Sequence, residues 1–143
     1  MILWGLKEEA SFDVWSIEHI IMGISIACFT DWMSKKLCKD ENVSENLRIK
    51  ISFIMALMFS YMWETLEHYL EVGLWGNAVS YWLQGVEHWS NRLICDNLMV
   101  MLGWWIYQQK NKIVWFARCF SVVWLFVHIF IFPHSMYLHE LFK

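Results

Sequence analysis

The chain has 143 residues, of which 58% are hydrophobic and 18% aromatic. Its net charge is −3 at pH 7, and the Lys and Arg residues are split between short segments, which excludes the basic surface of a nucleic-acid-binding protein. With one Pro and six Gly, the chain has no composition for a flexible linker, so we predict a single domain over residues 1–143.

Apolar segments separated by short charged ones dominate the chain. The last of them contains only Arg118 and His128 as charged or imidazole side chains, in a length that suits a bilayer. We therefore predict an all-α fold, an integral membrane four-helix bundle. Its spans are expected at about 14–31, 50–71, 91–108 and 113–132.

The positive charges predict an orientation for these spans. The first connection contains Lys35, Lys36, Lys39 and Arg48, and the third contains Lys110 and Lys112. The second connection, residues 72–90, has neither Lys nor Arg. Because cytoplasmic loops carry the excess of positive charge, both termini and the second connection are expected on the outer side, the periplasm of a bacterial inner membrane.

The second connection is too aromatic for a free loop. It contains Trp75, Tyr81, Trp82 and Trp89, side chains that favour the headgroup region of a membrane. Gly73, Gly76 and Gly85 bracket the segment NAVSYWLQ. We predict that this segment forms a short interfacial helix between spans two and three.

Polar groups in three of the spans are expected at one height. Residues 20–30, 51–63 and 97–107 carry no charge. At about 1.5 Å per residue, each stretch corresponds to about 18–20 Å of helix measured from the cytoplasmic side. His19, Glu64 and Asp96 therefore fall in the outer half of the membrane.

Further polar side chains follow from this layer up to the outer interface: Glu18, Glu67, His68, Glu71, Glu87, His88, Asn91 and Arg92. A charge at membrane depth costs at least about 2.5 kcal/mol unless it is paired or hydrated. The cost is lower if the polar faces of the three helices are turned toward one another. We therefore predict a polar cavity between them that is open to the outer face. Gly103 lies on the Asp96 stripe of span three and predicts a close helix contact.

The segment WETLEHYLEV, residues 63–72, carries the most concentrated set of candidate ligands. Mixed carboxylate and imidazole ligands suit zinc, iron or manganese. Carboxylate-bridged di-iron bundles use Glu-x-x-His pairs, and this chain has no strict Glu-x-x-His. The candidate divalent-metal ligands are His19, Glu64, Glu67, His68, Glu87, His88 and Asp96.

A second possibility is acid–base chemistry on the same surface. Arg92 would hold an anion, and the candidate catalytic groups are Glu64, Glu67, His68 and Asp96. This second possibility needs no metal, whereas the first would be a metal-dependent hydrolase or transferase. For both, a cavity at headgroup level favours an envelope lipid or polyprenyl headgroup as substrate. Ser16, Ser80 and Ser90 offer hydroxyls, but no Gly-x-Ser-x-Gly motif is present.

The alternative is a protein without catalytic activity. An accessory or ion- or proton-handling subunit of a membrane complex would use the charges as interhelical pairs, with Arg92 bound to Glu71 or Asp96. The apolar Trp and Met residues would serve a protein partner or a homo-oligomer as readily as lipid. His128, His134 and His139 are expected to play no part in metal binding.

Three short motifs resemble the VanZ-like and YjdF-like families of small bacterial membrane proteins. They are His-x-x-x-Gly from His19 to Gly23, aromatic-Glu-x-x-Glu over 63–67, and the trio Asn91, Asp96 and Gly103. Those families separate the first two residues of the trio by four positions, whereas this chain has five. The resemblance implies a helical protein of the cell envelope and a shared site architecture.

Overall fold

The computed structural model describes residues 2–39, 43–83, 85–127 and 130. Most of them are helical. The elements in chain order are β1 (Ile2–Trp4), β2 (Ala10–Phe12), α1 (Val14–Leu37), α2 (Glu45–Glu71), α3 (Asn77–Leu83), the π-helix η1 (Asn91–Cys95), α4 (Asp96–Gln109), the 3-10 helix η2 (Asn111–Ile113) and α5 (Val114–Phe126).

Two short strands depart from the all-α prediction. β1 and β2 pair in parallel, with Ile2 opposite Ala10 and Trp4 opposite Phe12. Strands of three residues are too short to show a period-two pattern, so the sequence contained no usable signal for them. Their pairing turns residues 5–9 into a loop at the end of the bundle.

Asp13 is the N-cap residue of helix α1. Asp13 is extended and accepts hydrogen bonds from the backbone N–H groups of Trp15 and Ser16, while the Ser16 side chain accepts from the backbone of Asp13. This reciprocal capping box satisfies donors that the first turn leaves free. The last turn carries Lys35 and Lys36, which favour the negative end of the helix dipole.

The short helix predicted in the second connection is present as α3. The three glycines that bracket it, Gly73, Gly76 and Gly85, all have positive φ angles of 100°, 90° and 89°. Side chains with a Cβ rarely adopt this conformation, so these residues fix the turns before and after α3.

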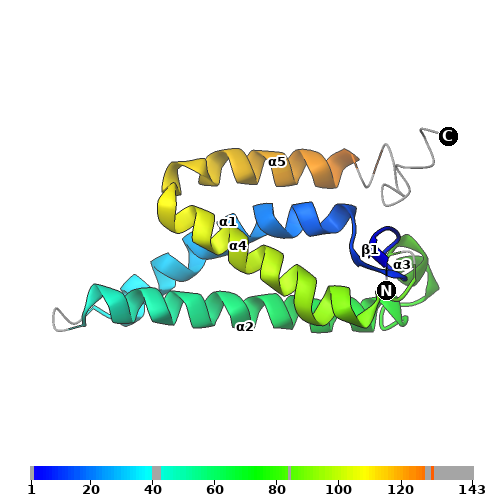
Figure 1. The fold of residues 1–143 in the computed structure, drawn as a ribbon, viewed down its shortest axis with the longest axis horizontal. Coiled ribbons are helices and arrows are strands. Elements are labelled where there is room, and N and C mark those ends of the chain that lie inside the picture. The colour runs from blue at the N-terminus through cyan, green and yellow to red at the C-terminus, as the bar shows by residue number, and fades with distance from the viewer. Residues whose placement is uncertain (1, 40–42, 84, 128–129, 131–143) are drawn as a thin grey trace.

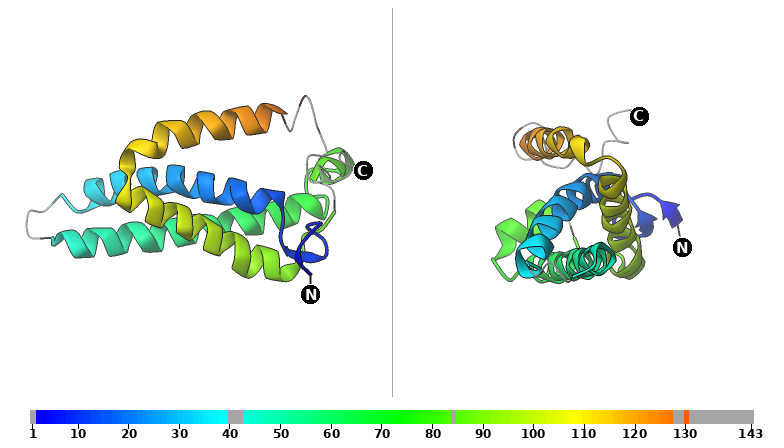
Figure 2. Two further views of the ribbon diagram at one scale, coloured as in Figure 1. Left: turned by 45° about the horizontal axis from the view of Figure 1, so that its top comes forward. Right: turned by 90° about the vertical axis from the view of Figure 1, so that its left-hand side faces the viewer.

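The four longer helices run lengthwise, with α1 packed against α4, α2 and α5 (Figures 1 and 2). The C-terminal end of α1, the N-terminal end of α2 and the turn from α4 to α5 lie at one end of the molecule (Figure 1). The N-terminus and α3 lie at the other end. The first and third connections therefore lie at one end of the molecule and the second connection lies at the other, in the order that the sequence predicted.

Two helices, α1 and α2, are each long and apolar enough to cross a membrane. Both extend beyond the predicted spans 14–31 and 50–71 at the end that carries Lys36 and Arg48. The third predicted span comprises η1 and α4 together. The last span begins at α5, and its end at 128–132, with His128, lies outside the described residues except for Phe130.

Helices α1 and α4 cross closely at two glycines, Gly23 and Gly103. A Cβ atom on Gly103 would lie 2.0 Å from the carbonyl oxygen of Ile20, and one on Gly23 would lie 2.2 Å from that of Val100. Both neighbours are backbone atoms, which cannot move aside as a side chain can. The predicted role of Gly103 in close helix packing is confirmed.

We expect Gly103→Ala to destabilise the fold by about 1–3 kcal/mol, because the added methyl group overpacks the crossing. Thermal unfolding of the detergent-purified protein, followed by Trp fluorescence, measures this. Gly5→Ala is the control, since a Cβ there would be at 3.5 Å from its neighbours, an ordinary contact. Equal melting temperatures for the two variants would contradict the close crossing.

Candidate functional site

At the end of the bundle near the N-terminus, α1, α2, α4 and the segment before η1 bring five ionisable side chains together. We name them the histidine–carboxylate cluster: His19, Glu64, Glu67, Glu87 and Asp96. His19, Glu64 and Glu67 form one group, and Glu64, Glu87 and Asp96 form a second, each with potential ligand atoms within 4.8 Å of one another. Glu64 belongs to both groups and is the centre of the cluster.

The imidazole of His19 is oriented by its own helix. Nδ1 lies 2.8 Å from the carbonyl oxygen of Trp15, and because a carbonyl only accepts, Nδ1 must carry the hydrogen. The other nitrogen, Nε2, then faces Oε1 of Glu64 at 3.1 Å. A backbone carbonyl that holds one ring nitrogen, and so directs the other toward a carboxylate, is typical of metal-binding histidines.

Glu64 is buried in the C-terminal third of α2, with 2% of its surface exposed. Apart from the contact with His19, neither of its carboxylate oxygens has a hydrogen-bond partner. Oε2 of Glu87 and Oδ2 of Asp96 also lack one. Buried carboxylates without donors are unstable unless a proton or a cation compensates them. An imidazolium at His19 or a bound metal ion would each meet this need at Glu64.

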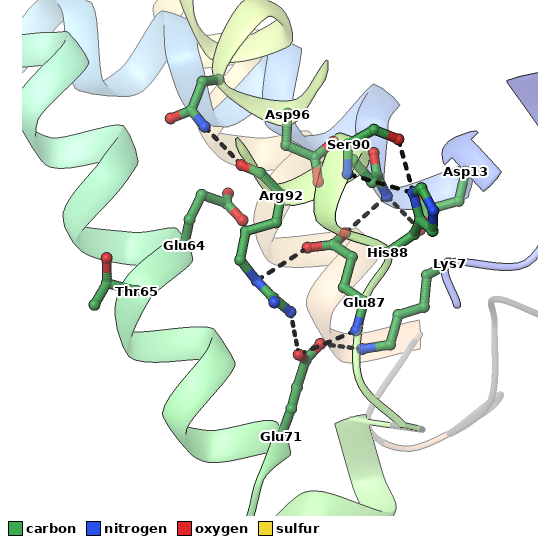
Figure 3. A network of polar contacts seen from close by, with 12 residues as sticks. Lys7, Asp13, Glu64, Thr65, Glu71, Glu87, His88, Ser90, Arg92 and Asp96 are labelled. Carbon is green, nitrogen blue, oxygen red and sulfur yellow. Dashed lines mark hydrogen bonds and ion pairs between the residues drawn. The ribbon is translucent and has the colours of Figure 1, made fainter. Parts of the chain in front are cut away.

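The buried cations of the described part of the chain serve a different carboxylate. Lys7 Nζ lies 2.6 Å from Oε1 of Glu71, and Arg92 binds Oε2 of the same group (Figure 3). Arg92 also lies 3.7 Å from Oε2 of Glu87. The prediction that Arg92 pairs with Glu71 is confirmed. Arg92 is thus already bound to an acid at the place where the sequence analysis expected it to hold an anion.

Lys7 is the residue that the sequence analysis missed. It lies in the loop between β1 and β2 and is 2% exposed, and its backbone carbonyl accepts a hydrogen bond of 2.7 Å from the N–H of His88. A lone Lys in an apolar N-terminal segment was the available signal. Its partner, 64 positions later, was not visible in the sequence.

Hydrogen bonds tie the cluster to the cap of α1. The Asn91 side chain donates to Oδ2 of Asp13 at 3.2 Å and to Oε1 of Glu87 at 2.7 Å, and Ser16 donates to Oδ1 of Asp96 at 3.1 Å. These bonds hold Glu87 and Asp96 toward α1. All three serines predicted to offer hydroxyls are engaged: Ser16 donates to Asp96, Ser80 donates to the carbonyl of Glu71, and Ser90 bonds Ser11.

The π-helix η1 explains the five-residue spacing between Asn91 and Asp96. The N–H of Asp96 bonds the carbonyl of Asn91, an i→i+5 contact in place of the usual i→i+4. In such a turn, residues five apart share one face, as residues four apart do in an α-helix. Both side chains therefore point into the same network.

Two carboxyl groups outside the helical spans show the electrostatic character of the site. Burial, followed by the charge of Asp96, raises the pKa of Asp13 to about 6. Burial also raises the pKa of Glu87 to about 11, and the nearby carboxylates of Asp96, Glu67 and Glu64 add to the shift. Ionising these carboxyl groups together is unfavourable, so the site favours a proton or another cation.

A cavity of about 430 Å³ lies above the cluster. Among the described residues, its charged and imidazole lining consists of Lys7, Glu18, His19, Glu67 and Glu87. The remaining walls are apolar and include five tryptophans: Trp15, Trp63, Trp75, Trp82 and Trp124. The cavity is therefore amphipathic, with ionisable groups on one side and aromatic rings around them.

Not all predicted ligands join the cluster. His68 and His88 belong to neither group of potential ligands found among the described residues. His88 Nδ1 lies 2.8 Å from the Ser90 hydroxyl, and the His68 ring contacts that of Tyr69. His134 and His139 lie outside the described residues.

The Lys7–Glu71 pair should contribute strongly to stability. We expect Lys7→Met to lower the free energy of unfolding by about 3–5 kcal/mol, because it removes a partner of a buried carboxylate. Lys35→Met is the matched control. Its pair with Asp31 has the same 2.6 Å distance but a Lys side chain that is 55% exposed, so about 1 kcal/mol or less is expected. Comparable losses in chemical denaturation would contradict a structural role of Lys7.

No protein-family model, curated protein sequence or solved structure matches this chain. The resemblance to VanZ-like and YjdF-like proteins therefore remains a prediction. The functional argument depends on the cluster and the cavity themselves.

Proposed function

We propose that this chain is a four-helix integral membrane protein that binds a divalent metal ion in the histidine–carboxylate cluster and acts on the headgroup of an envelope lipid or polyprenyl carrier. The observation that carries the proposal is the environment of Glu64. Apart from the contact of Oε1 with Nε2 of His19 at 3.1 Å, its two buried oxygens have no hydrogen-bond partner. A metal ion satisfies both the carboxylate and the imidazole at once.

The donor set fits this proposal. One imidazole nitrogen with carboxylates from Glu64, Glu67, Glu87 and Asp96 suits zinc, iron or manganese. Because Glu64 belongs to both ligand groups, it is the residue on which metal affinity should depend most. A bound ion of this kind polarises a phosphoryl or ester oxygen and lowers the pKa of bound water, as a hydrolase or transferase requires.

The alternative, charges that only join helices, accounts for part of the network. Lys7 and Arg92 both bind Glu71, and this arrangement is structural. As charged partners it leaves the four carboxyl groups of Glu64, Glu67, Glu87 and Asp96 only His19 and one long Arg92 contact within the described part of the chain. The neutral donors Asn91 and Ser16 add one hydrogen bond each to Glu87 and Asp96. The excess of carboxylates favours a metal ion over a purely structural cluster.

Membrane insertion is supported by the length and apolar character of α1 and α2 and by their outward-facing side chains. Trp32, Met58 and Met62 are 51%, 61% and 61% exposed. Large apolar groups at such exposure fit lipid better than water. The tryptophans around the cavity suit the headgroup level, where a lipid substrate would present its polar end.

The metal proposal predicts stoichiometric divalent metal in the detergent-purified protein, measured by elemental mass spectrometry after growth in metal-supplemented medium. Glu64→Gln preserves size and removes the charge, so we expect it to lose the metal. Glu45→Gln, an exposed position on the same helix, should retain it. His68→Ala should also retain it, because His68 lies outside both ligand groups. Wild-type protein without metal would contradict the proposal and leave the interhelical pairs as the explanation.

The orientation can be tested by cysteine labelling in intact cells. In a background without the native cysteines, Asn77→Cys should react with a membrane-impermeant maleimide, because α3 is expected on the outer side. Glu45→Cys, which is exposed at the opposite end of the molecule, should be protected until the cells are lysed. The reverse pattern would place the cavity on the cytoplasmic side.

A further inference from the structure

A second hollow lies directly beside the amphipathic cavity, between α1 and α2. It has a volume of about 630 Å³, and its walls are almost entirely apolar. We name it the α1–α2 groove. The side chains that define it are Met22, Ser25 and Phe29 from α1, and Phe59, Met62 and Trp63 from α2.

The groove and the cavity meet at shared side chains. Met22 and Trp63 line both of them. The polar groups of the cavity, including His19 and Glu67, lie on one side of this junction. Among the described residues that line the groove, the polar groups are the Ser25 hydroxyl and the indole N–H of Trp63. Together the two hollows match a molecule with a polar head and an apolar chain.

We propose that the α1–α2 groove holds one acyl chain of the membrane lipid whose headgroup enters the cavity. This inference depends on the proposed function for the headgroup and adds the binding site of the chain. It identifies the substrate class as an acyl lipid rather than a free, water-soluble phosphate or ester. Met22 and Trp63 then lie where the headgroup region passes into the hydrocarbon chain.

The shape and composition of the groove favour an acyl chain over a protein helix. From Met22 to Phe29, and from Phe59 to Leu66, the groove extends along about 10 Å of each helix, given a rise of about 1.5 Å per residue. Helices that dock in membranes meet at small residues such as Gly and Ala, whereas this lining is Met, Phe and Trp. Flexible Met side chains adapt to a chain without fixed shape.

The side chains of the groove also face the place where lipid would be. Phe29, Met62 and Trp63 are 46%, 61% and 43% exposed. If α1 and α2 span the bilayer, the groove is open to the hydrocarbon layer along its side, so an acyl chain can enter from the membrane while its headgroup reaches the cavity.

The test uses the full-length protein in nanodiscs that contain a phospholipid with a photoactivatable group in its acyl chain. After irradiation, mass spectrometry locates the cross-linked residues. We expect them at 22–29 and 59–66 on the faces that line the groove. In Ser25→Trp, an indole fills the groove and these cross-links should be lost. Met58→Trp is the matched control, since Met58 is 61% exposed on α2 and does not line the groove.

Metal content, measured on the same preparations, separates this inference from the proposed function. Ser25→Trp that retains metal and loses the groove cross-links supports the inference. Cross-links spread evenly over the outer faces of α1 and α2, or unchanged in Ser25→Trp, would overturn it even if metal is bound. Groove cross-links in a wild-type protein without metal would overturn the metal site and leave the acyl-chain site in place. Two further results would overturn the acyl-chain site. One is displacement of the photolipid by polyprenyl phosphate but not by unlabelled phospholipid, and the other is cross-linking between two copies of the chain.

Discussion

The arrangement of this end of the molecule depends on the cost of burying carboxyl groups. Asp13, Glu64, Glu71, Glu87 and Asp96 are all buried. Each needs a donor, a proton or a cation, because an ionised carboxylate away from water is otherwise strongly unfavourable. The chain meets this need unevenly: Glu71 receives two cations, Asp13 receives backbone N–H groups as the cap of α1, and Glu64 receives only the imidazole of His19. Glu71 and Asp13, which have their donors, form a structural part of the network. Glu64, which has few, belongs to a part suited to a ligand.

Local features of the helices bring distant segments of the chain together in the polar network. The capping box at Asp13 fixes the start of α1 and also supplies an acceptor for Asn91. The π-helix η1 turns Asn91 and Asp96 to one face in spite of their spacing of five. The glycine crossing of α1 and α4 then brings the two backbones close enough for Ser16 and Asp96 to bond. Local irregularities in helices, rather than long loops, position the site.

Much of this arrangement could be predicted from the sequence, because hydrophobic segments and their interruptions are local signals. The helices, the short helix α3, the role of Gly103 and the gathering of polar groups at one end all followed from spacing along single segments. The strands β1 and β2 and the place of Lys7 did not, since the partners of Lys7 are distant in sequence and three-residue strands have no period. His68 lies on α2 beside Glu67, but its ring contacts Tyr69. His88 follows Glu87 in the second connection, but its ring contacts the Ser90 hydroxyl. The π-turn was also invisible, because nothing in NRLIC distinguishes it from a regular helix.

The contacts of Lys7 also set the order in which the site is completed during synthesis. Residues 2–12 are synthesised before the groups that hold Lys7, which are Glu71 and the backbone N–H of His88. His19 and Glu64 are likewise made before Glu87 and Asp96. Until the segment before α4 has been synthesised, the N-terminal loop lacks its contact with His88, and the cluster lacks the carboxylates of Glu87 and Asp96. The cluster is therefore completed late in synthesis, when residues 87–96 pack against the N-terminal loop and α1.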